Sequence, residues 1–537
     1  MPPLEVASVI ESAAEPLRSR ARPCEPEACS WLMCQAPRLS GTRPASAKRG
    51  GGGARARPRR VHGVPIGRSA ARPWAVRIGP MLPSRDPHDR PAELAVLADA
   101  DRRAQDYVAA IGSRPVYPSV HAREALSGFD EELSAAGHDE RSTIALLDEL
   151  GSAAAVESNG ARYFGFVVGA TLPVAAAADR LVLAWDNTAS TPLGSPATSA
   201  IEAIAARWVV EVLDLPRDSA VGFSTSAGAG TVAILATARQ HVLAQLGWDV
   251  ARRGLTGAPP VRVVASELAH VVVRKALRVL GFGSDLVEWV RTDEYGRIDP
   301  DALPAVDAST IVILQAGEVN TGEFDPFEPI MQKVRASAGW IHVDGAFGLW
   351  ARASRLRPLT DGIDRADSWT VDGHKWLNTP YDSAVSIVRN RDAANAALHS
   401  DATYAPSTDD AQKNLTLEFS RRARGIPIWA ALRTLGRDGV AELVENSTAT
   451  ATRIADGLRG AGYTVLNRVV LNQVLARAGS AEETARIVAA AQASGHTWFG
   501  ATVWRGEPAF RISVSSWRTR AEDADALVEL LAGLARA

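Results

Sequence analysis

Between residues 221 and 390, short runs rich in Val and Ile alternate with helical stretches, and this alternation constrains the fold more than any other feature. Such a pattern is typical of an α/β domain with a mostly parallel sheet. The strands of such a sheet are buried on both faces, so they read as continuous apolar runs. The predicted strands are 261–266, 310–315, 340–344, 368–372 and 384–388, and the predicted helices between them include 270–280 and 325–338.

Helices and a smaller mixed region are predicted on either side of this sheet. Amphipathic helices are expected over 91–112, 141–152 and 197–213. After residue 425, the chain predicts helices at 428–459, 481–494 and 520–535, with strands at 463–466, 500–504 and 509–515. We therefore expect an N-terminal helical segment (81–190), a large α/β domain (191–425) and a small C-terminal α+β domain (426–537).

The first 80 residues differ in composition from the rest of the chain. They hold 14 basic and only five acidic residues, a run of four glycines, and all three cysteines: Cys24, Cys29 and Cys34. No apolar core follows a basic start, so a secretory signal is not indicated. An Arg-rich, acid-poor segment is compatible with a transit peptide or a nucleic-acid-binding arm. We favour a disordered or spurious extension, because ordinary composition begins at Met81.

Composition after Met81 excludes several classes of protein. The absence of cysteine there excludes a disulfide framework, a thiolate nucleophile and a cysteine-based zinc site, and no metal site is predicted. The longest apolar candidate, 165–178, is shorter than the roughly 18–20 residues of a spanning helix. Basic and acidic residues are mixed, so no nucleic-acid-binding stripe is indicated. We expect a cytoplasmic protein.

Several predicted strands end in polar residues. Such residues occur at 266–270, at 315–320, at Asp344 and at 372–375. In open α/β sheets, ligands bind at the carboxyl ends of the strands. The sequence therefore predicts a binding site at that edge of the sheet.

A small-residue turn, STSAGAG (224–230), joins a strand to an apolar-periodic helix. Small residues let the backbone approach an anion, and a helix N-terminus supplies N–H groups and the positive end of a dipole. The turn matches neither the P-loop nor the GxGxxG spacing. A phosphate cradle and a plain flexible turn are both open interpretations.

Three side chains at the strand ends are candidates for chemistry. Asp344, in HVDGAFG, suits a metal ligand, a base or the partner of a protonated ring nitrogen, and equally a turn or helix cap. Lys375, in DGHKWLNTPYD, is one of only five lysines and suits an amine nucleophile, although a strand-end lysine more commonly extends to solvent. His270 suits stacking on a flat cofactor, polarising a carbonyl or capping a helix.

A polar segment, 399–414, contains a single aromatic residue, Tyr404. A catalytic lid with one buried residue at its tip has this composition. A surface loop has it too, so the segment alone does not decide between them.

Taken in order, these motifs resemble the group II pyridoxal-phosphate (PLP) decarboxylases, which include the aromatic-L-amino-acid and glutamate decarboxylases. The resemblance covers most of residues 90–535. Its most specific parts are HVDGAFG and DGHKWLNTPYDSA, supported by YFGF (163–166), SPA…E (195–202) and SRRARGIPIWAALRTLGR (420–437). It implies the fold of the fold-type-I PLP-dependent transferases, with a large mostly parallel sheet domain and a small C-terminal α+β domain.

The resemblance also implies roles for individual residues. Lys375 would form the Schiff base with PLP, Asp344 would pair with the pyridinium nitrogen, and His270 would stack on the ring. Tyr404, on the lid, would return a proton to the substrate α-carbon, giving an amine. Members of the family are homodimers with the active site at the interface. The remaining cofactor-binding residues implied are Ser226, Ala227, Gly228, Val319, Ala346, Asp372 and His374.

The chain departs from the family pattern at four positions. Gly228 stands where a Ser or Thr is usual, and Ala229 where an acid is common, so a hydroxyl contact to phosphate is missing. Asp372 stands where several members have asparagine and would repel a phosphate unless it turns away or pairs with a cation. Glu318 stands where a neutral residue is usual and suggests contact with a cationic substrate group.

The function implied is an L-amino-acid decarboxylase, a PLP-dependent carboxy-lyase. The alternatives are another reaction of the same fold, either transamination or carbon–carbon lysis, and a catalytically degenerate homologue that acts as a binding protein. Arg511 could bind a substrate carboxylate as aminotransferase arginines do, but we expect it to form a salt bridge in the small domain. The identity of the amino acid is not readable from the sequence.

Overall fold

The computed structural model describes residues 89–400, 403, 408 and 410–536. The chain divides into two units, residues 1–78 and 79–537, and the description that follows concerns the second. The extension predicted over residues 1–80 therefore lies outside the described residues. The predicted domain boundaries at residues 190 and 425 stay predictions.

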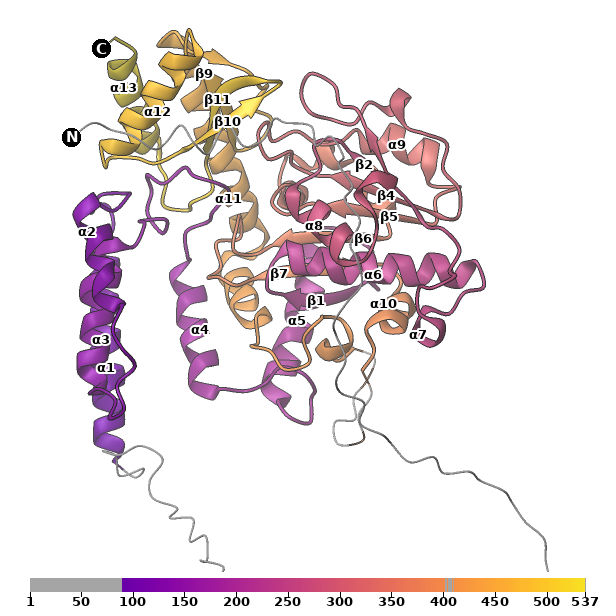
Figure 1. The fold of residues 1–537 in the computed structure, drawn as a ribbon, viewed down its shortest axis with the longest axis horizontal. Coiled ribbons are helices and arrows are strands. Elements are labelled where there is room, and N and C mark those ends of the chain that lie inside the picture. The colour runs from indigo at the N-terminus through magenta and orange to yellow at the C-terminus, as the bar shows by residue number, and fades with distance from the viewer. Residues whose placement is uncertain (1–88, 401–402, 404–407, 409, 537) are drawn as a thin grey trace, which may run out of the picture. The chain divides into compact units, whose positions relative to one another are not determined.

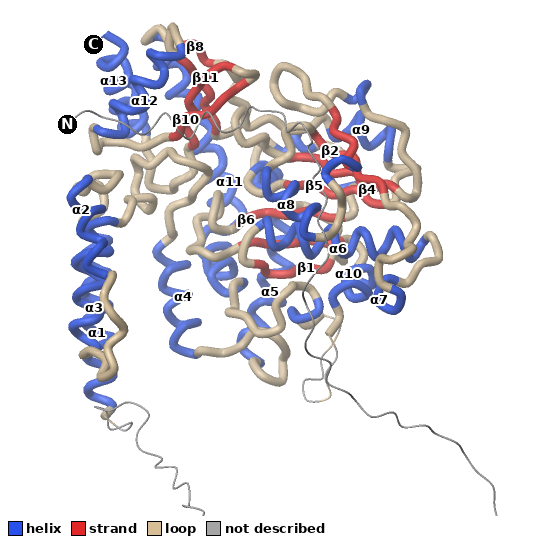
Figure 2. Tube along the Cα trace, in the orientation of Figure 1, coloured by secondary structure: helices blue, strands red, loops and turns tan. Residues whose placement is uncertain are grey.

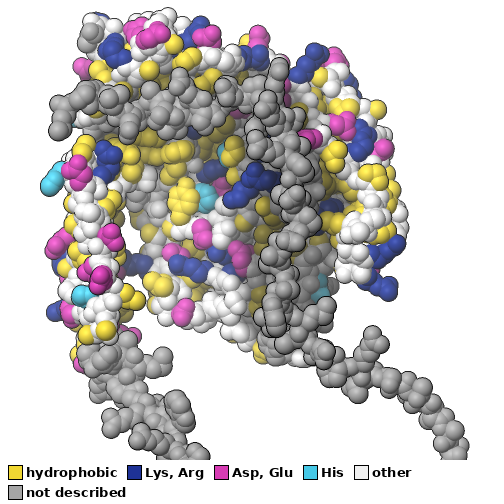
Figure 3. All heavy atoms as spheres, in the orientation of Figure 1, with side chains coloured by type: hydrophobic (Ala, Val, Ile, Leu, Met, Phe, Trp, Pro, Cys, Tyr) yellow, Lys and Arg dark blue, Asp and Glu magenta, His cyan; other side chains and the backbone are white. Residues whose placement is uncertain are grey.

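Among the described residues, five α-helices precede the first strand of the large sheet. Helix α1 begins at a proline-containing first turn, where the Asp89 carboxylate accepts a hydrogen bond from the Ala92 N–H at 3.1 Å. No residue of α1 is buried, and Figure 3 shows charged side chains of both signs mixed with apolar ones along α1 and α3. The five are α1 (Arg90–Ala109), α2 (Val120–Glu124), α3 (Glu140–Leu146), α4 (Pro173–Trp185) and α5 (Pro196–Val212).

The large sheet has seven strands in the order β1-β7-β6-β5-β4-β2-β3. Only β7 runs antiparallel to its neighbours, so the sheet is mostly parallel, as predicted. Figure 2 shows these strands in red at the centre of the large domain. Their bounds are β1 (Ala220–Ser224), β2 (Arg262–Ser266), β3 (Val287–Val290), β4 (Thr310–Gln315), β5 (Trp340–Asp344), β6 (Ser368–Asp372) and β7 (Ala384–Val388).

Alternating residues of the central strands pack into two hydrophobic cores, one on each face of the sheet. In β4, Ile311 and Ile313 pack with helices α6, α8 and α10, whereas Val312 and Leu314 pack with α5, α9 and α11. Burial on both faces explains why this strand is apolar at every one of these positions. The helices that follow β1 are α6 (Ala227–Gln245), α7 (Val250–Arg253), α8 (Val271–Val279), α9 (Phe327–Val334) and α10 (Arg391–Leu398).

A small antiparallel sheet, in the order β10-β11-β9-β8, forms the C-terminal region with its own apolar core. The long helix α11 contacts α4 and α5 as well as β8, β9 and α13, so it links the large and small sheets (Figure 1). The C-terminal α+β arrangement predicted from the sequence is confirmed. The elements are α11 (Gly425–Gly460), β8 (Thr464–Val465), β9 (Gln473–Arg477), α12 (Ala481–Ala493), β10 (Gly500–Trp504), β11 (Glu507–Ser513) and α13 (Ala521–Arg536).

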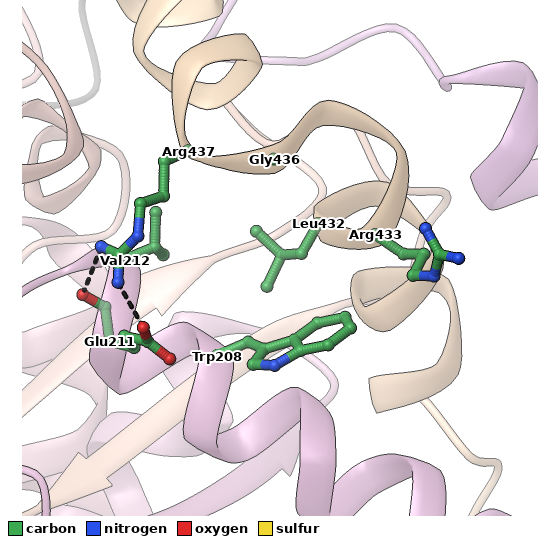
Figure 4. A pocket seen from close by; sticks show the side chains of 7 residues that line it. All are labelled: Trp208, Glu211, Val212, Leu432, Arg433, Gly436 and Arg437. Carbon is green, nitrogen blue, oxygen red and sulfur yellow. Dashed lines mark hydrogen bonds and ion pairs between the residues drawn. The ribbon is translucent and has the colours of Figure 1, made fainter.

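Helix α11 is interrupted at Gly436, whose φ of 63° lies in the left-handed region that favours glycine. A cavity of about 280 Å³ opens between α5 and this kink. Figure 4 shows Trp208 and Leu432 facing one another across it, with Arg437 hydrogen-bonded to Glu211 at one side. None of its lining residues belongs to the strand ends where the sequence predicts a ligand.

Among the described residues, no helix combines the length and the apolar character that crossing a membrane requires.

Candidate active site

A cavity of about 460 Å³ lies where β4, β5 and β6 end and α6 begins. Ten residues predicted from the sequence to bind the cofactor line it together, although they come from positions as far apart as 226 and 375. Other lining residues include Phe166, Gln315, Phe347, Tyr381 and Arg511. The ten predicted residues are Ser226, Ala227, Gly228, His270, Val319, Asp344, Ala346, Asp372, His374 and Lys375.

Asp344 is the last residue of β5 and is only 4% exposed. Its carboxylate accepts a hydrogen bond from the Ala346 N–H at 3.2 Å. Burial raises the pKa of Asp344, while the nearby His270 and Lys375 act in the opposite direction. A buried carboxyl group of this kind is stabilised as an anion only beside a positive partner.

His270 lies between β2 and α8 and caps that helix. The Val272 N–H donates to its Nδ1 at 3.4 Å, which places the proton of the neutral imidazole on Nε2. Burial lowers the pKa of His270, against the opposing effect of Asp344. The ring is therefore neutral near pH 7 and presents a flat, uncharged surface to the cavity.

Helix α6 begins in the cavity wall, and the backbone N–H groups of its first turn have no hydrogen-bond acceptor within the helix. The Ser226 hydroxyl caps the helix by accepting from the Ala229 N–H at 3.2 Å. The Ala227 N–H donates instead to the Asp372 carboxylate at 2.7 Å. A side-chain carbon added at Gly228 would meet its neighbours at no less than 3.5 Å, so the missing hydroxyl is not forced by lack of space.

Lys375 follows β6 in a turn that is fixed by close backbone contacts. A side-chain carbon on Gly169 would lie only 1.9 Å from the Lys375 carbonyl oxygen, so only glycine fits there. The Trp376 indole N–H donates to the Ser447 hydroxyl at 3.0 Å, which ties the turn to α11. The Lys375 Nζ lies 2.8 Å from Asp372 Oδ2. The amine is thus held in the cavity by an anchored turn and an ion pair.

His374 also faces the Asp372 carboxylate, with Nε2 3.6 Å from Oδ1. The Ser383 N–H donates to its Nδ1 at 3.2 Å. Burial lowers the pKa of His374, with Asp372 opposing that effect. The two residues place an imidazole and a carboxylate beside the start of α6.

Glu318 does not line the cavity, contrary to the expectation that it contacts a substrate group. Its carboxylate accepts from the backbone N–H groups of Asn320 and Thr321, both at 2.7 Å, and from the Thr321 hydroxyl at 3.1 Å. Burial raises the pKa of Glu318, and these hydrogen bonds oppose the rise. Its carboxylate is used to hold the turn that carries Val319.

Arg511, from β11 of the small sheet, reaches the cavity wall. The expected salt bridge is wrong: within the part of the chain that the structure describes, no carboxylate oxygen lies within 4.0 Å of its guanidinium. Arg511 donates instead to the Val319 carbonyl at 2.5 Å. Burial lowers the pKa of Arg511. The guanidinium is therefore a partly buried cation at the cavity, available to an anionic group.

Sequence reasoning did not single out the aromatic residues of the cavity. The Tyr381 ring stacks on His374 with centroids 4.2 Å apart. Phe166 stacks on Trp498 at 5.7 Å, and Trp498 also stacks on Tyr163 at 5.4 Å. Phe166 lies in the YFGF motif and Tyr381 in the DGHKWLNTPYD motif. The motifs therefore include both residues, but they do not indicate which rings these residues stack on.

A buried ion pair joins α5 to the segment that precedes α11. The Arg421 guanidinium contacts both Glu202 oxygens, at 2.5 and 3.0 Å, and both side chains are 1% exposed. Glu202 also accepts from the Gly425 N–H at 2.9 Å. The pair gives a structural reason for two motifs of the sequence, SPA…E and SRRARG.

Replacing Glu202 with alanine is expected to lower the free energy of unfolding by about 3–5 kcal/mol, because it leaves the Arg421 charge buried without a partner. Glu211, on the same helix, pairs with Arg437 at the surface, and Glu211→Ala should cost at most about 1 kcal/mol. Chemical denaturation followed by circular dichroism measures both. Equal costs for the two variants would contradict this account.

The lid residue Tyr404 lies outside the described residues, so its predicted role stays a prediction.

The model of the pyridoxal-dependent decarboxylase conserved domain matches residues 161–474. Tryptophan decarboxylase 1 of Oryza sativa subsp. japonica is 27% identical over 322 residues, which is 56% of this chain and 63% of that protein. The alignment with this relative thus spans less than two thirds of its length. L-2,4-diaminobutyrate decarboxylase of Rhizobium meliloti is 27% identical over 387 residues, 67% of this chain and 75% of that protein.

Solved structures resemble the fold over most of the chain. The structure of Oryza sativa TDC with PLP and tryptamine has a TM-score of 0.78 at 21% identity. The match covers 84% of this chain and 99% of that one. Mouse CSAD has a TM-score of 0.76 at 20% identity, with 83% and 99% covered. These similarities confirm the predicted fold class.

Proposed function

The chain belongs to the pyridoxal-dependent decarboxylase family, and we propose that it removes carbon dioxide from an L-amino acid with PLP bound in the cavity around Lys375. The observation that carries this proposal is the meeting of three groups in one cavity: the Lys375 amine, the buried Asp344 carboxylate and the N-terminus of α6. PLP, when bound, supplies an electron sink for the electrons of the bond to the departing carboxylate.

Apart from the Asp372 carboxylate, the residues present fit this cofactor at each of its polar ends. The N–H groups of Ala227 and Gly228, with Ser226 and His374 beside them, suit a phosphate at a helix N-terminus. The Lys375 amine suits covalent attachment to an aldehyde. The apolar side chains of Val319 and Ala346 suit the faces of a flat ring.

Asp344 would hold a proton on the ring nitrogen of the cofactor. Because its carboxylate is buried, a cationic partner relieves the cost of its charge, and the proton shared between them stays on the ring. His270 is neutral and would lie against the ring without adding a competing charge. These two residues tune the cofactor, while Lys375 positions it.

We propose an aromatic or other large apolar side chain for the substrate. Phe166 lines the cavity and is 61% exposed, and it stacks on Trp498, which in turn stacks on Tyr163. Apolar walls also favour a reaction in which the charge of a carboxylate is lost as neutral carbon dioxide. Arg511, from β11 of the small sheet, would orient an anionic group of the substrate.

A homodimer with a shared active site and a cytoplasmic location are further proposals. Large apolar side chains are exposed on and beside α4, among them Leu181, Leu183 and Leu193, and such surfaces commonly mark association sites.

The purified protein loaded with PLP is expected to release carbon dioxide from aromatic L-amino acids and to form one amine for each carbon dioxide.

Tyr404→Phe should then shift the product from amine toward aldehyde, because the proton donor is lost and oxidation by dioxygen competes. Chromatography of the products measures the ratio. No carbon dioxide from any L-amino acid would contradict the proposed function, and an unchanged ratio would remove the proton-donor role of Tyr404.

A further inference from the structure

The Asp372 carboxylate contacts three groups at once in the cavity. Its Oδ1 accepts from the Ala227 N–H at 2.7 Å and lies 3.6 Å from His374 Nε2, and its Oδ2 lies 2.8 Å from Lys375 Nζ. The side chain is 3% exposed. A fixed anion therefore binds both the first N–H of α6 and the amine of Lys375.

These are the groups that the proposed function assigns to the cofactor. Phosphate needs the Ala227 N–H and benefits from His374, and the aldehyde needs Lys375. A single N–H cannot donate a full hydrogen bond to a carboxylate and to a phosphate at the same time. Two anions within a few ångströms of each other also repel more strongly in a cavity that is partly shielded from water. The Asp372 contacts and the cofactor contacts are in conflict.

The backbone of Asp372 cannot withdraw to relieve this conflict. Its N–H donates to the Ala346 carbonyl at 2.8 Å, and its carbonyl accepts from the Trp350 indole at 3.0 Å. The residue is also paired with Ala384 in the sheet. Only rotation of the side chain remains, and rotation gives up the hydrogen bond to Ala227.

We propose that Asp372 is an internal competitor for the phosphate group of the cofactor. The carboxylate occupies the anion site at the start of α6 and must leave it when phosphate binds. The affinity of this chain for PLP is therefore lower than that of a variant with an uncharged residue at position 372. The absence of a hydroxyl at Gly228 acts in the same direction. This inference rests on the proposed function, since it presumes that PLP is the ligand.

A simple positioning role for Asp372 makes the opposite prediction. If the carboxylate served mainly to orient Lys375, its replacement would weaken PLP binding or leave it unchanged. Competition predicts tighter binding, so the sign of the effect separates the two roles.

The experiment uses the full chain stripped of cofactor and titrated with PLP, followed by visible absorbance. Asp372→Asn is expected to bind PLP about tenfold more tightly or better, because a charge beside the phosphate is removed. The gain should persist when both proteins also carry Lys375→Ala and binding is measured by equilibrium dialysis, since competition for the Ala227 N–H does not need the lysine. Pyridoxal, which lacks the phosphate, should gain at most about twofold.

The matched control is Asp382→Asn, which removes a carboxylate that pairs with Arg424 and does not line the cavity. Its PLP affinity should equal that of the wild type. Asp372→Ser serves as a second variant if the asparagine variant fails to fold, and it should also bind PLP more tightly.

Unchanged or weaker PLP binding by the Asp372 variants would overturn the proposal. An equal gain for pyridoxal and PLP would overturn it too, because the effect would not involve the phosphate. Failure of the wild type to bind PLP at all would instead refute the proposed function itself, so the two failures are distinguishable.

Discussion

Lys375→Ala is expected to lower the rate of carbon dioxide release by about 10³-fold or more, because the variant loses the amine that holds the cofactor and can carry protons at the reacting carbon. The other described lysines, Lys275, Lys333 and Lys413, do not line the cavity. Initial rates at saturating substrate measure the effect, and visible absorbance reports the loss of the bound chromophore.

Lys275→Ala is the matched control, because Lys275 is exposed on α8 and does not line the cavity. Its rate and its absorbance should equal those of the wild type. A Lys375→Ala variant that keeps the wild-type rate would refute the assignment of the site.

Asp344→Asn is expected to reduce turnover by about 10²-fold while leaving most of the cofactor bound. The amide has nearly the same shape as the carboxylate, so contacts that depend on shape are kept. It carries no negative charge, however, and therefore no longer favours a proton on the ring nitrogen. Turnover depends on that proton, whereas cofactor content depends mainly on Lys375 and the start of α6.

Two measurements on the same preparation separate these effects: the turnover rate per chain and the PLP content per chain. Equal losses of both would contradict a role for Asp344 at the ring nitrogen and would indicate a role in binding alone.

The large sheet could be predicted because its central strands are buried on both faces. The runs at 310–315 (TIVILQ) and 340–344 (WIHVD) are mostly apolar and fully buried, and the structure has strands with the same bounds. Strands β3 (Val287–Val290) and β9 (Gln473–Arg477) were not predicted from the sequence. Strand β3 is at the edge of the sheet with Glu288 and Trp289 half-buried, and a short strand of mixed character has no clear period.

The site could be predicted in part for a related reason. Asp344 ends β5 and Lys375 follows the adjacent strand β6, and parallel strands bring their carboxyl ends to the same edge. Contacts across long sequence separations could not be read in this way. Asp372 and Ala227 are 145 positions apart, and Arg511 enters from the small sheet to reach Val319. Their pairing depends on how whole elements pack, which no local pattern records.

The same reason explains the two expectations that the structure changes. A charged residue in a motif indicates that a charge is needed, but not which partner it takes. Glu318 uses its carboxylate on its own turn, and Arg511 binds a backbone carbonyl instead of an acid. Both side chains became interpretable only once their neighbours in space were known.

The central claim, that PLP is held by Lys375, is tested most directly by reducing the loaded protein with borohydride and locating the trapped cofactor by peptide mass spectrometry. The chain has only five lysines, so the assignment is unambiguous. The account predicts one phosphopyridoxyl group per chain, on Lys375, and none on the Lys375→Ala variant. A trapped group on another lysine, or no trapped group in the wild type, would contradict it.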